Sequence, residues 1–273
     1  MKGSKQKPLV CVTGSNGHVG SWIVKELLEN NYRVRAVIRN LKQQNRFDFL
    51  KAFDSSGDSI EFVEYDFVTL KSGFEKILEN CRFLIHTAAP YYLSTTNPEK
   101  DLVLPSVRGT LTVLEAAMKV KSIEKVVITG SIASITDSSK KNYVYTELDW
   151  NNESSLYRNP YYYAKTQGER AAMQLIKSKK PHYTLIYLNP SMCVGPELNP
   201  TAPVNTSNQI LLNCINGHYP AVFAGAWALI DVRDVAKIHR IALEHQKMEG
   251  RYLVTYKSLW MKVNLISPNI FAK

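Results

Sequence analysis

The stretch Leu9–Asn40 constrains the fold more than any other part of the chain, because it predicts a strand, a glycine loop, a helix and a second strand in direct succession. The short apolar run Leu9–Val12 is typical of a parallel strand that is buried on both faces. Apolar side chains then recur at helical spacing over Val19–Leu28, and Arg33–Ile38 predicts the second strand. The sequence therefore predicts a parallel βαβ unit with glycines at its first turn.

The glycine loop carries Gly14, Gly17 and Gly20 in the spacing T-G-x-x-G-x-x-G. Glycines between a buried strand and an amphipathic helix leave backbone N–H groups and the positive end of the helix beside a bound phosphate. The alternative is a tight turn that only allows the helix to pack against the sheet. We interpret the loop as a nucleotide site because it lies between a strand and a helix.

The end of the second strand indicates which dinucleotide is bound. NAD sites place an acidic residue there, on the ribose 2′-hydroxyl, whereas NADP sites place an arginine near the 2′-phosphate. No acid occurs between Glu29 and Asp48, and Arg39 stands at the strand end with Lys42 and Arg46 after it. The sequence thus predicts NADP(H) as the cofactor; the alternative for Arg39 is a solvated strand-end charge.

The formal charge of +10 and the pI of about 9.3 suit an anionic cofactor or substrate. Lysine and arginine are spread along the chain without an aromatic-interleaved basic motif, which favours a solvated surface over a nucleic-acid interface. No apolar run approaches the roughly 20 residues of a membrane-spanning helix, so no membrane partner is expected. Four scattered cysteines without a C-x-x-C pair indicate no metal and no disulfides, but the reduced thiols of a cytoplasmic protein.

Strands and helices continue to alternate after the βαβ unit. The expected strands are Ser59–Tyr65, Arg82–His86, Val126–Thr129, Tyr183–Leu188 and Gly250–Tyr256, and the expected helices are Gln43–Phe53, Leu70–Leu78, Pro98–Val120, one opened by Asn159-Pro160, Ile210–Asn216 and Asp234–His245. This order predicts an α/β fold with a doubly wound parallel sheet of the Rossmann type. Residues 1–189 are expected to form the cofactor-binding domain, and residues 190–273 a smaller substrate-binding portion interleaved with it.

Three residues form a candidate catalytic set. Ser131 follows the strand Val126–Thr129, and Tyr161 and Lys165 form a Y-x-x-x-K motif, which places both on one face of a helix. A neighbouring ammonium and the positive helix end lower a tyrosine pKa from its usual value of about 10, so Tyr161 can give a proton to a carbonyl oxygen while hydride reaches the carbon. The Ser131 hydroxyl would hydrogen-bond that oxygen, and Lys165 would also hold the nicotinamide ribose.

Each member of this set also has a purely structural interpretation. A tyrosine at a helix start often packs against its neighbours, and a serine after a strand is often a turn residue. Their occurrence together, after a dinucleotide loop, favours the catalytic hypothesis. For three further residues the structural interpretation is preferred: Glu169 as a surface ion pair, His86 as a buried core histidine and His18 as a loop-packing residue.

The order of these motifs resembles that of the extended short-chain dehydrogenases/reductases. The similar segments are TGSNGHVGSWIVKELLENNYRVRAVIRN, the pair Asp66-Phe67, HTAAP from His86, VVITGSIAS, YYYAK, NPSMCVGP from Asn189 and IDVRDVAKIHRIAL from Ile230. Within that superfamily the chain looks most like the branch of dihydroflavonol reductases, cinnamoyl-CoA reductases and yeast-type methylglyoxal reductases. The resemblance implies an NADPH-dependent enzyme that reduces a small aldehyde or ketone. It also implies a monomer or a homodimer formed through the helices Pro98–Val120 and Tyr161–Lys177.

The resemblance implies a role for each matching residue. Ser131, Tyr161 and Lys165 would be the catalytic triad. The residues implied to contact the cofactor are Gly14, Asn16, Gly17, His18, Val19 and Gly20 at the pyrophosphate, Arg39 and Arg46 at the 2′-phosphate, Asp66 and Phe67 at the adenine, and Thr87, Ala88, Ala89, Thr129, Tyr161, Lys165, Pro190 and Cys193 along the rest of the dinucleotide.

Two positions depart from this branch. Gly130 replaces a second serine of many relatives, and Thr136 stands where plant dihydroflavonol reductases carry a substrate-reading asparagine, so a flavonoid substrate is not expected. Relatives also continue beyond the segment like Gly250–Val254, which predicts a shortened substrate lobe. Two alternatives stay open, a nucleotide-sugar epimerase or dehydratase and a non-catalytic NADP(H)-binding protein. Arg39 argues against the first, which usually retains NAD, and the complete triad argues against the second.

Overall fold

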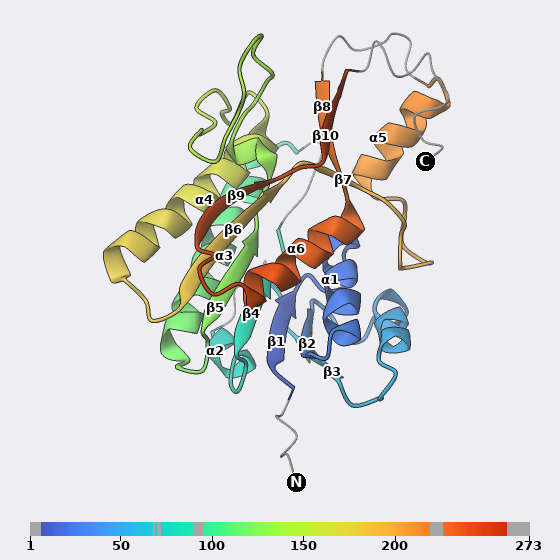
Figure 1. Cartoon of the computed structure of the whole chain (residues 1–273), viewed down its shortest axis with the longest axis vertical. Coiled ribbons are helices and arrows are strands. Elements are labelled where there is room, and N and C mark those ends of the chain that lie inside the picture. The colour runs from blue at the N-terminus through green and yellow to red at the C-terminus, as the bar shows by residue number, and fades with distance from the viewer. Residues whose placement is uncertain (1–6, 68, 70–71, 90–94, 219–225, 261–273) are drawn as a thin grey trace.

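A parallel sheet of seven strands forms the centre of the computed structural model, which describes residues 7–67, 69, 72–89, 95–218 and 226–260 (Figure 1). In spatial order the strands are β3 (Ile60–Glu64), β2 (Arg33–Ile38), β1 (Leu9–Thr13), β4 (Phe83–His86), β5 (Lys125–Thr129), β6 (Thr184–Pro190) and β9 (Gly250–Val254). The strand order reverses between β1 and β4, which is the switch point where open α/β sheets bind ligands. The predicted Rossmann-type sheet is confirmed.

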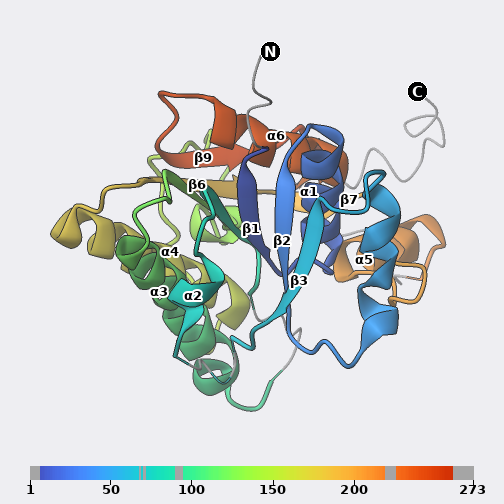
Figure 2. The ribbon, with the colours of Figure 1, turned by 90° about the horizontal axis from the view of Figure 1, so that it is seen from below.

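Helices cover both faces of this sheet (Figure 2). One face carries α1 (His18–Glu29) and α6 (Val232–Glu244), and the other carries α2 (Phe74–Ile77), α3 (Leu104–Lys119) and α4 (Pro160–Lys179). Successive residues of β1 alternate between the two cores, with Val10 and Val12 beside α1 and α6, and Leu9 and Cys11 on the other side. Because both faces are buried, the strand is apolar throughout.

A second, three-stranded sheet lies beyond the carboxyl end of β6, next to α5 (Thr206–Ile215) (Figure 1). In it β8 (Ala226–Asp231) pairs antiparallel with β10 (Lys257–Trp260) and parallel with β7 (Met192–Val194). The strand β9 instead joins the main sheet, in register with β6 from Ile186↔Gly250 to Pro190↔Val254. The last part of the chain thus contributes to both sheets, and its role as a substrate-binding portion interleaved with the cofactor-binding domain stays a prediction.

The predicted helix Gln43–Phe53 is wrong, because this segment forms two separate 3-10 turns, Gln44–Arg46 and Asp48–Phe53. Between them Phe47 has a φ of −142°. Its buried ring packs with the centroid 5.0 Å from that of Phe62 on β3. Tertiary packing of one aromatic residue therefore overrides the local preference for a helix.

Two other helices begin later than predicted. The helix α2 begins at Phe74, after Gly73, whose φ of +100° is not helical; the first two residues of the predicted helix, 70 and 71, lie outside the described residues. The helix α3 begins at Leu104 and is preceded by a π-helical turn, Glu99–Val103. Pro105 stands in the first turn of α3, directly after this π-helical turn, and has no N–H to donate to the carbonyl groups of the turn before it.

In the described part of the chain, no helix has both the length and the apolar character needed to cross a membrane. Cys11, Cys81 and Cys214 are buried free thiols, and Cys193 is a partly buried one.

Candidate active site

The carboxyl ends of neighbouring strands bring the predicted site residues to one edge of the main sheet. The strands β1, β4, β5 and β6 end at Thr13, His86, Thr129 and Pro190, and they are adjacent in that order. The glycine loop, the segment after His86, the turn at Ser131 and the strand β7 follow these ends. Because the strands are parallel, segments that are far apart in the sequence meet at this edge.

The glycine loop packs so tightly that two of its glycines leave no room for a side chain. A Cβ atom on Gly20 would lie 2.1 Å from the carbonyl oxygen of Gly14, and one on Gly14 would lie 2.6 Å from Oγ1 of Thr87. Gly14 also has a φ of +67°, which favours glycine. A Cβ atom on Gly17 would approach only the Gly14 oxygen, at 3.3 Å, so the loop is open on the side of this exposed residue.

The start of α1 fits the phosphate groups of a dinucleotide. Its N-cap is Gly17, which has no side chain to satisfy the first N–H groups of the helix. Within the described residues, Nε2 of His18 is buried and has no hydrogen-bond partner. Val19 packs against the core beneath this end. An anion placed here would accept hydrogen bonds from the backbone and meet the positive helix end, so these residues fit a pyrophosphate.

A carboxylate from the last part of the chain holds the His18 ring. Nδ1 of His18 lies 3.0 Å from Oε2 of Glu197, and one turn later Trp22 donates from Nε1 to the carbonyl oxygen of Pro196 at 2.8 Å. Burial raises the pKa of Glu197, but hydrogen bonds from Asn205 and the contact with His18 outweigh it, so this pKa is lowered. His18 was predicted to pack within the glycine loop, but it is the first residue of α1 and its ring contacts Glu197 instead. This partner, 179 residues away, left no signal in the sequence.

Arg39 and Arg46, the two residues implied for the 2′-phosphate, both follow β2, and each contacts another residue that is implied to bind the cofactor. Arg39 directly follows β2, its side chain is 74% exposed, and its Nε lies 3.8 Å from Oδ1 of Asp66. The side chain of Asn16 donates from Nδ2 to the backbone oxygen of Arg46 at 3.3 Å. The structure thus connects the glycine loop with the basic residues that follow β2.

His86 is a buried core histidine, as predicted. Its Nδ1 lies 2.8 Å from Oγ1 of Thr13, and its ring packs against Phe67 with the centroids 5.2 Å apart. Burial and the nearby ammonium of Lys165 lower the pKa of His86 to about 3, so the ring is neutral at physiological pH. Thr13 also holds the segment that follows His86. The hydroxyl of Thr87 donates to the carbonyl oxygen of Thr13 at 2.7 Å.

Lys165 lines a small cavity at this edge, and its ammonium lies beside the ring of Tyr161. Its ammonium is 5.9 Å from the centre of the Tyr161 ring, one helical turn earlier on α4. The cavity is also lined by His86, Ala88, Ala89 and Thr129. Burial lowers the pKa of Lys165 to about 8, although Glu169 and Cys193 act in the opposite direction. The sequence-predicted residues of α4, β4 and β5 therefore meet around one partly buried ammonium.

Cys193 faces the same ammonium from β7. Burial raises the pKa of its thiol to about 12, and Lys165 lowers it only in part, so the thiol stays protonated. Its Sγ lies 3.4 Å from the carbonyl oxygen of Ser191, just after the buried Pro190. Cys193, implied to lie by the nicotinamide, thus lies within electrostatic range of Lys165, whereas the position of Pro190 at the nicotinamide stays a prediction.

Ser131 opens a tight turn after β5. Its N–H donates to Oδ1 of Asn189 at 3.0 Å, and its Oγ accepts from the N–H of Ala133 at 3.2 Å. A Cβ atom on Gly130 would lie 2.0 Å from the same Asn189 oxygen. The amide that holds Ser131 in place therefore also excludes a side chain at the position where relatives carry serine.

The side chain of Thr129 makes a hydrogen bond within the fold, and its implied contact with the cofactor stays a prediction. Its Oγ1 lies 2.8 Å from Nε2 of His239 on α6, whose Nδ1 lies 2.7 Å from the carbonyl oxygen of Val235. A carbonyl oxygen can only accept, so Nδ1 carries the proton and Nε2 accepts from Thr129. Burial lowers the pKa of His239 to about 4, which keeps the ring neutral. The hydroxyl proton of Thr129 is thus used within the fold.

Glu169 is not the surface ion pair that was predicted, because its side chain is fully buried. Its Oε1 lies 2.6 Å from Nε of Arg251 on β9 and accepts from Nδ2 of Asn189 at 3.0 Å. Ser134 donates to the other carboxylate oxygen. The helical spacing indicated only that Glu169 follows Lys165 by one turn, and a partner 82 residues away leaves no local pattern.

The fold and this edge define a protein of the Rossmann type with a Y-x-x-x-K helix at the carboxyl edge of its parallel sheet. Residues 10–254 match the NAD dependent epimerase/dehydratase family. The chain belongs to this family, that is, to the extended short-chain dehydrogenases/reductases, in the branch of dihydroflavonol, cinnamoyl-CoA and Gre2-type reductases.

Individual relatives agree with this assignment. An uncharacterized oxidoreductase of Schizosaccharomyces pombe is 36% identical over 262 residues, which cover 90% of this chain and 77% of that protein. A cinnamoyl-CoA reductase of Medicago truncatula is 31% identical over 262 residues, 92% of this chain and 77% of its own length. The crystal structure of Gre2 from Candida albicans in complex with NADPH has a TM-score of 0.81 and 31% identity, covering 92% of this chain and 79% of that one. The predicted resemblance is confirmed.

Proposed function

We propose that this protein is an NADPH-dependent reductase of a small aldehyde or ketone. Relatives named cinnamoyl-CoA reductase and dihydroflavonol 4-reductase support carbonyl reduction, and the Gre2 complex with NADPH supports the cofactor. Arg39 at the end of β2, where NAD sites carry an acid, supports NADP over NAD. Bound NADPH would supply the hydride for the carbonyl carbon.

Tyr161 gives the proton in this proposal. It lies in the first turn of α4, where the positive helix end favours the phenolate that remains after proton transfer. The ammonium of Lys165, 5.9 Å from the ring centre, acts in the same direction. His86 is neutral because its pKa is about 3, and the pKa of Cys193 is about 12, so neither group competes with this ammonium by its own charge.

Ser131 holds the substrate oxygen. Its Oγ already accepts from the N–H of Ala133, so its own proton can be donated to the carbonyl oxygen. This hydrogen bond shares the negative charge that develops on the oxygen as hydride arrives at the carbon. Lys165 holds the nicotinamide ribose as well as supporting Tyr161.

The cofactor itself is bound at the glycine loop and at the end of β2. The N–H groups at the start of α1 hold the pyrophosphate, and Arg39 and Arg46 hold the 2′-phosphate. The segment Thr87–Ala89 lines the dinucleotide, because the tight contact of Thr87 with Gly14 brings its backbone to the loop.

The observation that carries this proposal is the ammonium of Lys165 beside Tyr161 at the carboxyl edge of the sheet. The test is NADPH oxidation by the full chain with a panel of aldehydes, diketones and aryl ketones. We expect oxidation with one class of carbonyl compound. Tyr161→Phe should lower kcat by at least about 100-fold, because general acid catalysis contributes that much, and leave the Kd for NADPH unchanged. Tyr163→Phe, two residues later on α4, is the matched control and should keep activity.

Wild-type turnover by Tyr161→Phe would contradict the assigned proton donor. Conversion of a nucleotide sugar without net change of the cofactor would instead identify an epimerase or dehydratase. Tight NADPH binding without turnover of any carbonyl compound would identify a binding protein.

A further inference from the structure

A buried carboxylate one helical turn beyond Lys165 has no part in the proton transfer described above. The side chain of Glu169 is 0% exposed, although it is charged and lies on the helix that carries Tyr161 and Lys165. Its partners come from three other elements: Arg251 on β9, Asn189 on β6 and Ser134 in the turn after β5. We propose that Glu169 is a positioning residue that fixes the Ser131 turn relative to α4. Its kinetic consequences rest on the proposed reductase function, whereas its geometry does not.

Asn189 carries the link from Glu169 to Ser131. Its Nδ2 donates to Oε1 of Glu169 at 3.0 Å, and its Oδ1 accepts from the N–H of Ser131 at 3.0 Å. A flipped amide could make neither bond, because its oxygen would face a carboxylate and its NH₂ group would face an N–H. Glu169 therefore fixes the amide orientation that Ser131 needs.

Ser134 provides a second link between the same two elements. Its hydroxyl donates to Oε2 of Glu169, and its oxygen lies 2.9 Å from the carbonyl oxygen of Ser131. Ser134 is fully buried, so a hydroxyl that lost this acceptor could donate only to the carbonyl oxygen of Ser131 or to Oδ1 of Asn189 and would no longer link the turn to α4. The turn from Ser131 to Ser134 is thus attached to α4 at both ends.

Arg251 keeps the carboxylate in place. Its Nε lies 2.6 Å from Oε1 of Glu169, and its Nη1 donates to the carbonyl oxygens of Glu147 and Asp149 at 2.6 and 3.0 Å. The guanidinium stacks on Trp150, 3.6 Å from the ring centroid. Because the arginine is held on several sides, the buried carboxylate has a counter-charge in one fixed position.

Glu169 also favours the charged form of Lys165. Its negative charge raises the pKa of Lys165 against the larger lowering by burial. Among the described residues, the titratable groups around Lys165 are Tyr161 and Glu169 on α4, His86 at the end of β4, Tyr187 on β6 and Cys193 on β7. Since His86 is neutral and the Cys193 thiol is protonated, removal of the Glu169 charge should make Lys165 lose its proton at lower pH.

Two substitutions separate the hydrogen bonds that Glu169 makes to the Ser131 turn from the negative charge of Glu169. Glu169→Ala removes every contact, and we expect kcat to fall about 10- to 100-fold through misplacement of Ser131, with the Kd for NADPH unchanged. Glu169→Gln keeps an acceptor for Arg251 and Asn189 but removes the charge. It should keep most of kcat at neutral pH while the alkaline limb of its rate profile moves to lower pH. Ser134→Ala cuts the second link without changing any charge and should lower kcat less than Glu169→Ala.

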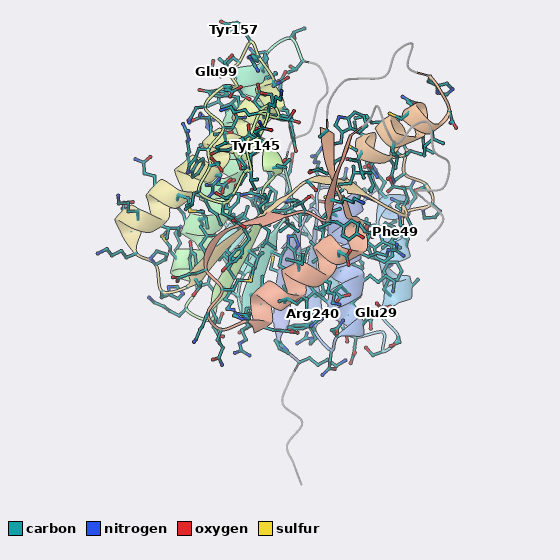
Figure 3. The ribbon with its side chains drawn as sticks, turned by 45° about the horizontal axis from the view of Figure 1, so that its top comes forward. Glu29, Phe49, Glu99, Tyr145, Tyr157 and Arg240 are labelled. Carbon is teal, nitrogen blue, oxygen red and sulfur yellow. The ribbon has the colours of Figure 1, made fainter. Side chains whose placement is uncertain are left out.

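A matched control pair lies on the other face of the sheet. Arg240 on α6, labelled in Figure 3 far from Tyr145 and Tyr157, forms an ion pair with Glu26 on α1 at 2.8 Å. Both side chains of this pair are largely buried, so Glu26→Ala and Glu26→Gln test the loss of such a pair away from Ser131. Their kcat and their alkaline limb should match those of the wild type.

Hydrogen exchange of the Ser131 amide tests the geometry without any turnover. We expect this amide to exchange faster in Glu169→Ala, relative to the core strands, and to stay protected in Glu26→Ala. Equal protection in Glu169→Ala, or an unmoved alkaline limb in Glu169→Gln together with full kcat in Glu169→Ala, overturns the positioning role. A wild-type chain that reduces no carbonyl compound overturns the proposed function, and the exchange result then still decides the positioning role.

Discussion

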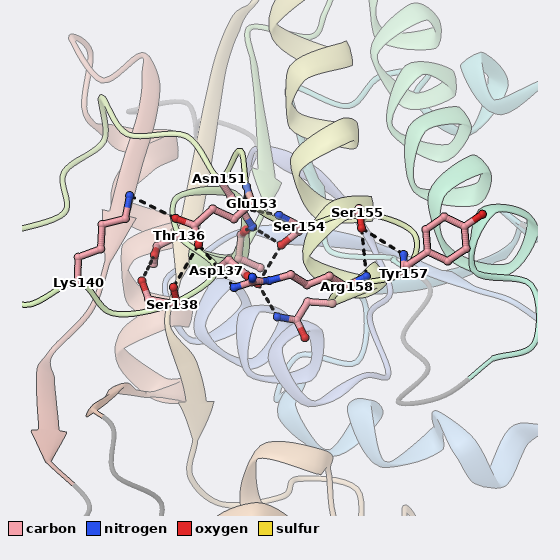
Figure 4. Close-up of polar contacts among 12 residues, drawn as sticks. Thr136, Asp137, Ser138, Lys140, Asn151, Glu153, Ser154, Ser155, Tyr157 and Arg158 are labelled. Atoms are coloured by element: carbon pink, nitrogen blue, oxygen red, sulfur yellow. Dashed lines mark hydrogen bonds and ion pairs between the residues drawn. The ribbon is translucent and has the colours of Figure 1, made fainter.

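The carboxylate of Asp137 is fully buried, yet it lies 2.7 Å from Nε of Arg158, a side chain that is 58% exposed (Figure 4). Asp137 also accepts from Nδ2 of Asn159 and from the hydroxyl of Ser154 at 2.9 Å. Asn159, the N-cap of α4, has the unusual φ of +50° and uses its side chain on Asp137 instead of on the helix. One buried carboxylate therefore holds the two residues that precede Pro160 and the helix of Tyr161.

Asp137→Asn should destabilise the protein by about 1.5–3 kcal/mol at neutral pH, the range for hydrogen bonds to charged groups. Burial raises the pKa of Asp137, but the hydrogen bonds from Asn159, Arg158 and Ser154 outweigh it, so the folded pKa is lowered. Its stabilisation is therefore complete above the unfolded value of about 3.9 and is lost as the pH falls through the folded value.

Urea unfolding at a series of pH values measures this effect. The difference in unfolding free energy between the wild type and Asp137→Asn should be largest near neutral pH and shrink in acid. Glu249→Gln, at an exposed glutamate, serves as the control and should match the wild type throughout. A difference that is independent of pH would contradict the assigned role of the ionised carboxylate.

Gly20→Ala and Gly17→Ala should separate folding from cofactor binding. The added methyl at Gly20 would meet the backbone oxygen of Gly14, which cannot swing away, so we expect a loss of about 1–3 kcal/mol in stability. Gly17 has a φ of −78° and an open side. The free energy of unfolding of its alanine variant should therefore lie within about 0.5 kcal/mol of the wild-type value.

Calorimetry with NADPH completes this comparison. The methyl group of Gly17→Ala would stand where the pyrophosphate is proposed to lie, so the Kd for NADPH should rise at least about 10-fold, equal to 1.4 kcal/mol. A stable Gly17→Ala protein that binds NADPH like the wild type would show that the loop is only a tight turn.

Local patterns in the sequence predicted most of the fold. The strand Arg33–Ile38 was predicted with its observed bounds, because a buried parallel strand between two polar turns has a simple signature. The segment Gln43–Phe53 failed because the contact of Phe47 with Phe62 on another strand decides its shape, and no local rule contains that contact.

The site residues also divide into those with a local sequence pattern and those defined by contacts between distant parts of the chain. The Y-x-x-x-K motif and the glycine loop are short-range patterns, so Tyr161, Lys165 and the three glycines could be found in the sequence. Other partners come from distant parts of the chain and look in the sequence like ordinary surface or core residues. They are Glu197, which contacts His18, His239, which contacts Thr129, and Arg251, which contacts Glu169. Such partners determine protonation and orientation, and only the folded chain brings them together.

The rate of carbonyl reduction should fall as the pH rises through about 8, the lowered pKa of Lys165. The pKa of this ammonium lies below its ordinary value because burial disfavours the charged form, so it loses its proton within an accessible pH range. Without the ammonium, the phenolate of Tyr161 is less stable and proton transfer is slower. The dependence of kcat/KM on pH for the full chain measures this limb in the free enzyme.

Lys165→Arg provides the check on this assignment. A guanidinium has a pKa above about 12, so it stays charged. The decrease of the rate near pH 8 should therefore be absent in Lys165→Arg, even if the rate itself is lower. An alkaline limb at an unchanged pH in Lys165→Arg would assign the limb to another group, such as Tyr161 itself.

Arg39→Ala should weaken NADPH binding about 10- to 100-fold and change NADH binding by less than about twofold, because only NADPH carries the 2′-phosphate. Arg39 is largely exposed at the end of β2, with its Nε 3.8 Å from Asp66, so the guanidinium is oriented but remains accessible to a ligand. Lys42→Ala removes an exposed cation three residues later and should leave the preference for NADPH nearly intact.

The salt dependence of binding distinguishes a direct phosphate contact from a general effect of positive charge. Exposed charges are screened over about 8 Å at physiological ionic strength, so added salt should reduce the wild-type preference for NADPH over NADH. In Arg39→Ala that preference should be small at every salt concentration, whereas in Lys42→Ala it should follow the wild-type curve. Equal Kd values for NADPH and NADH in the wild type would contradict NADP specificity. Arg39 would then be only a solvated charge at the end of β2, without a role in cofactor choice.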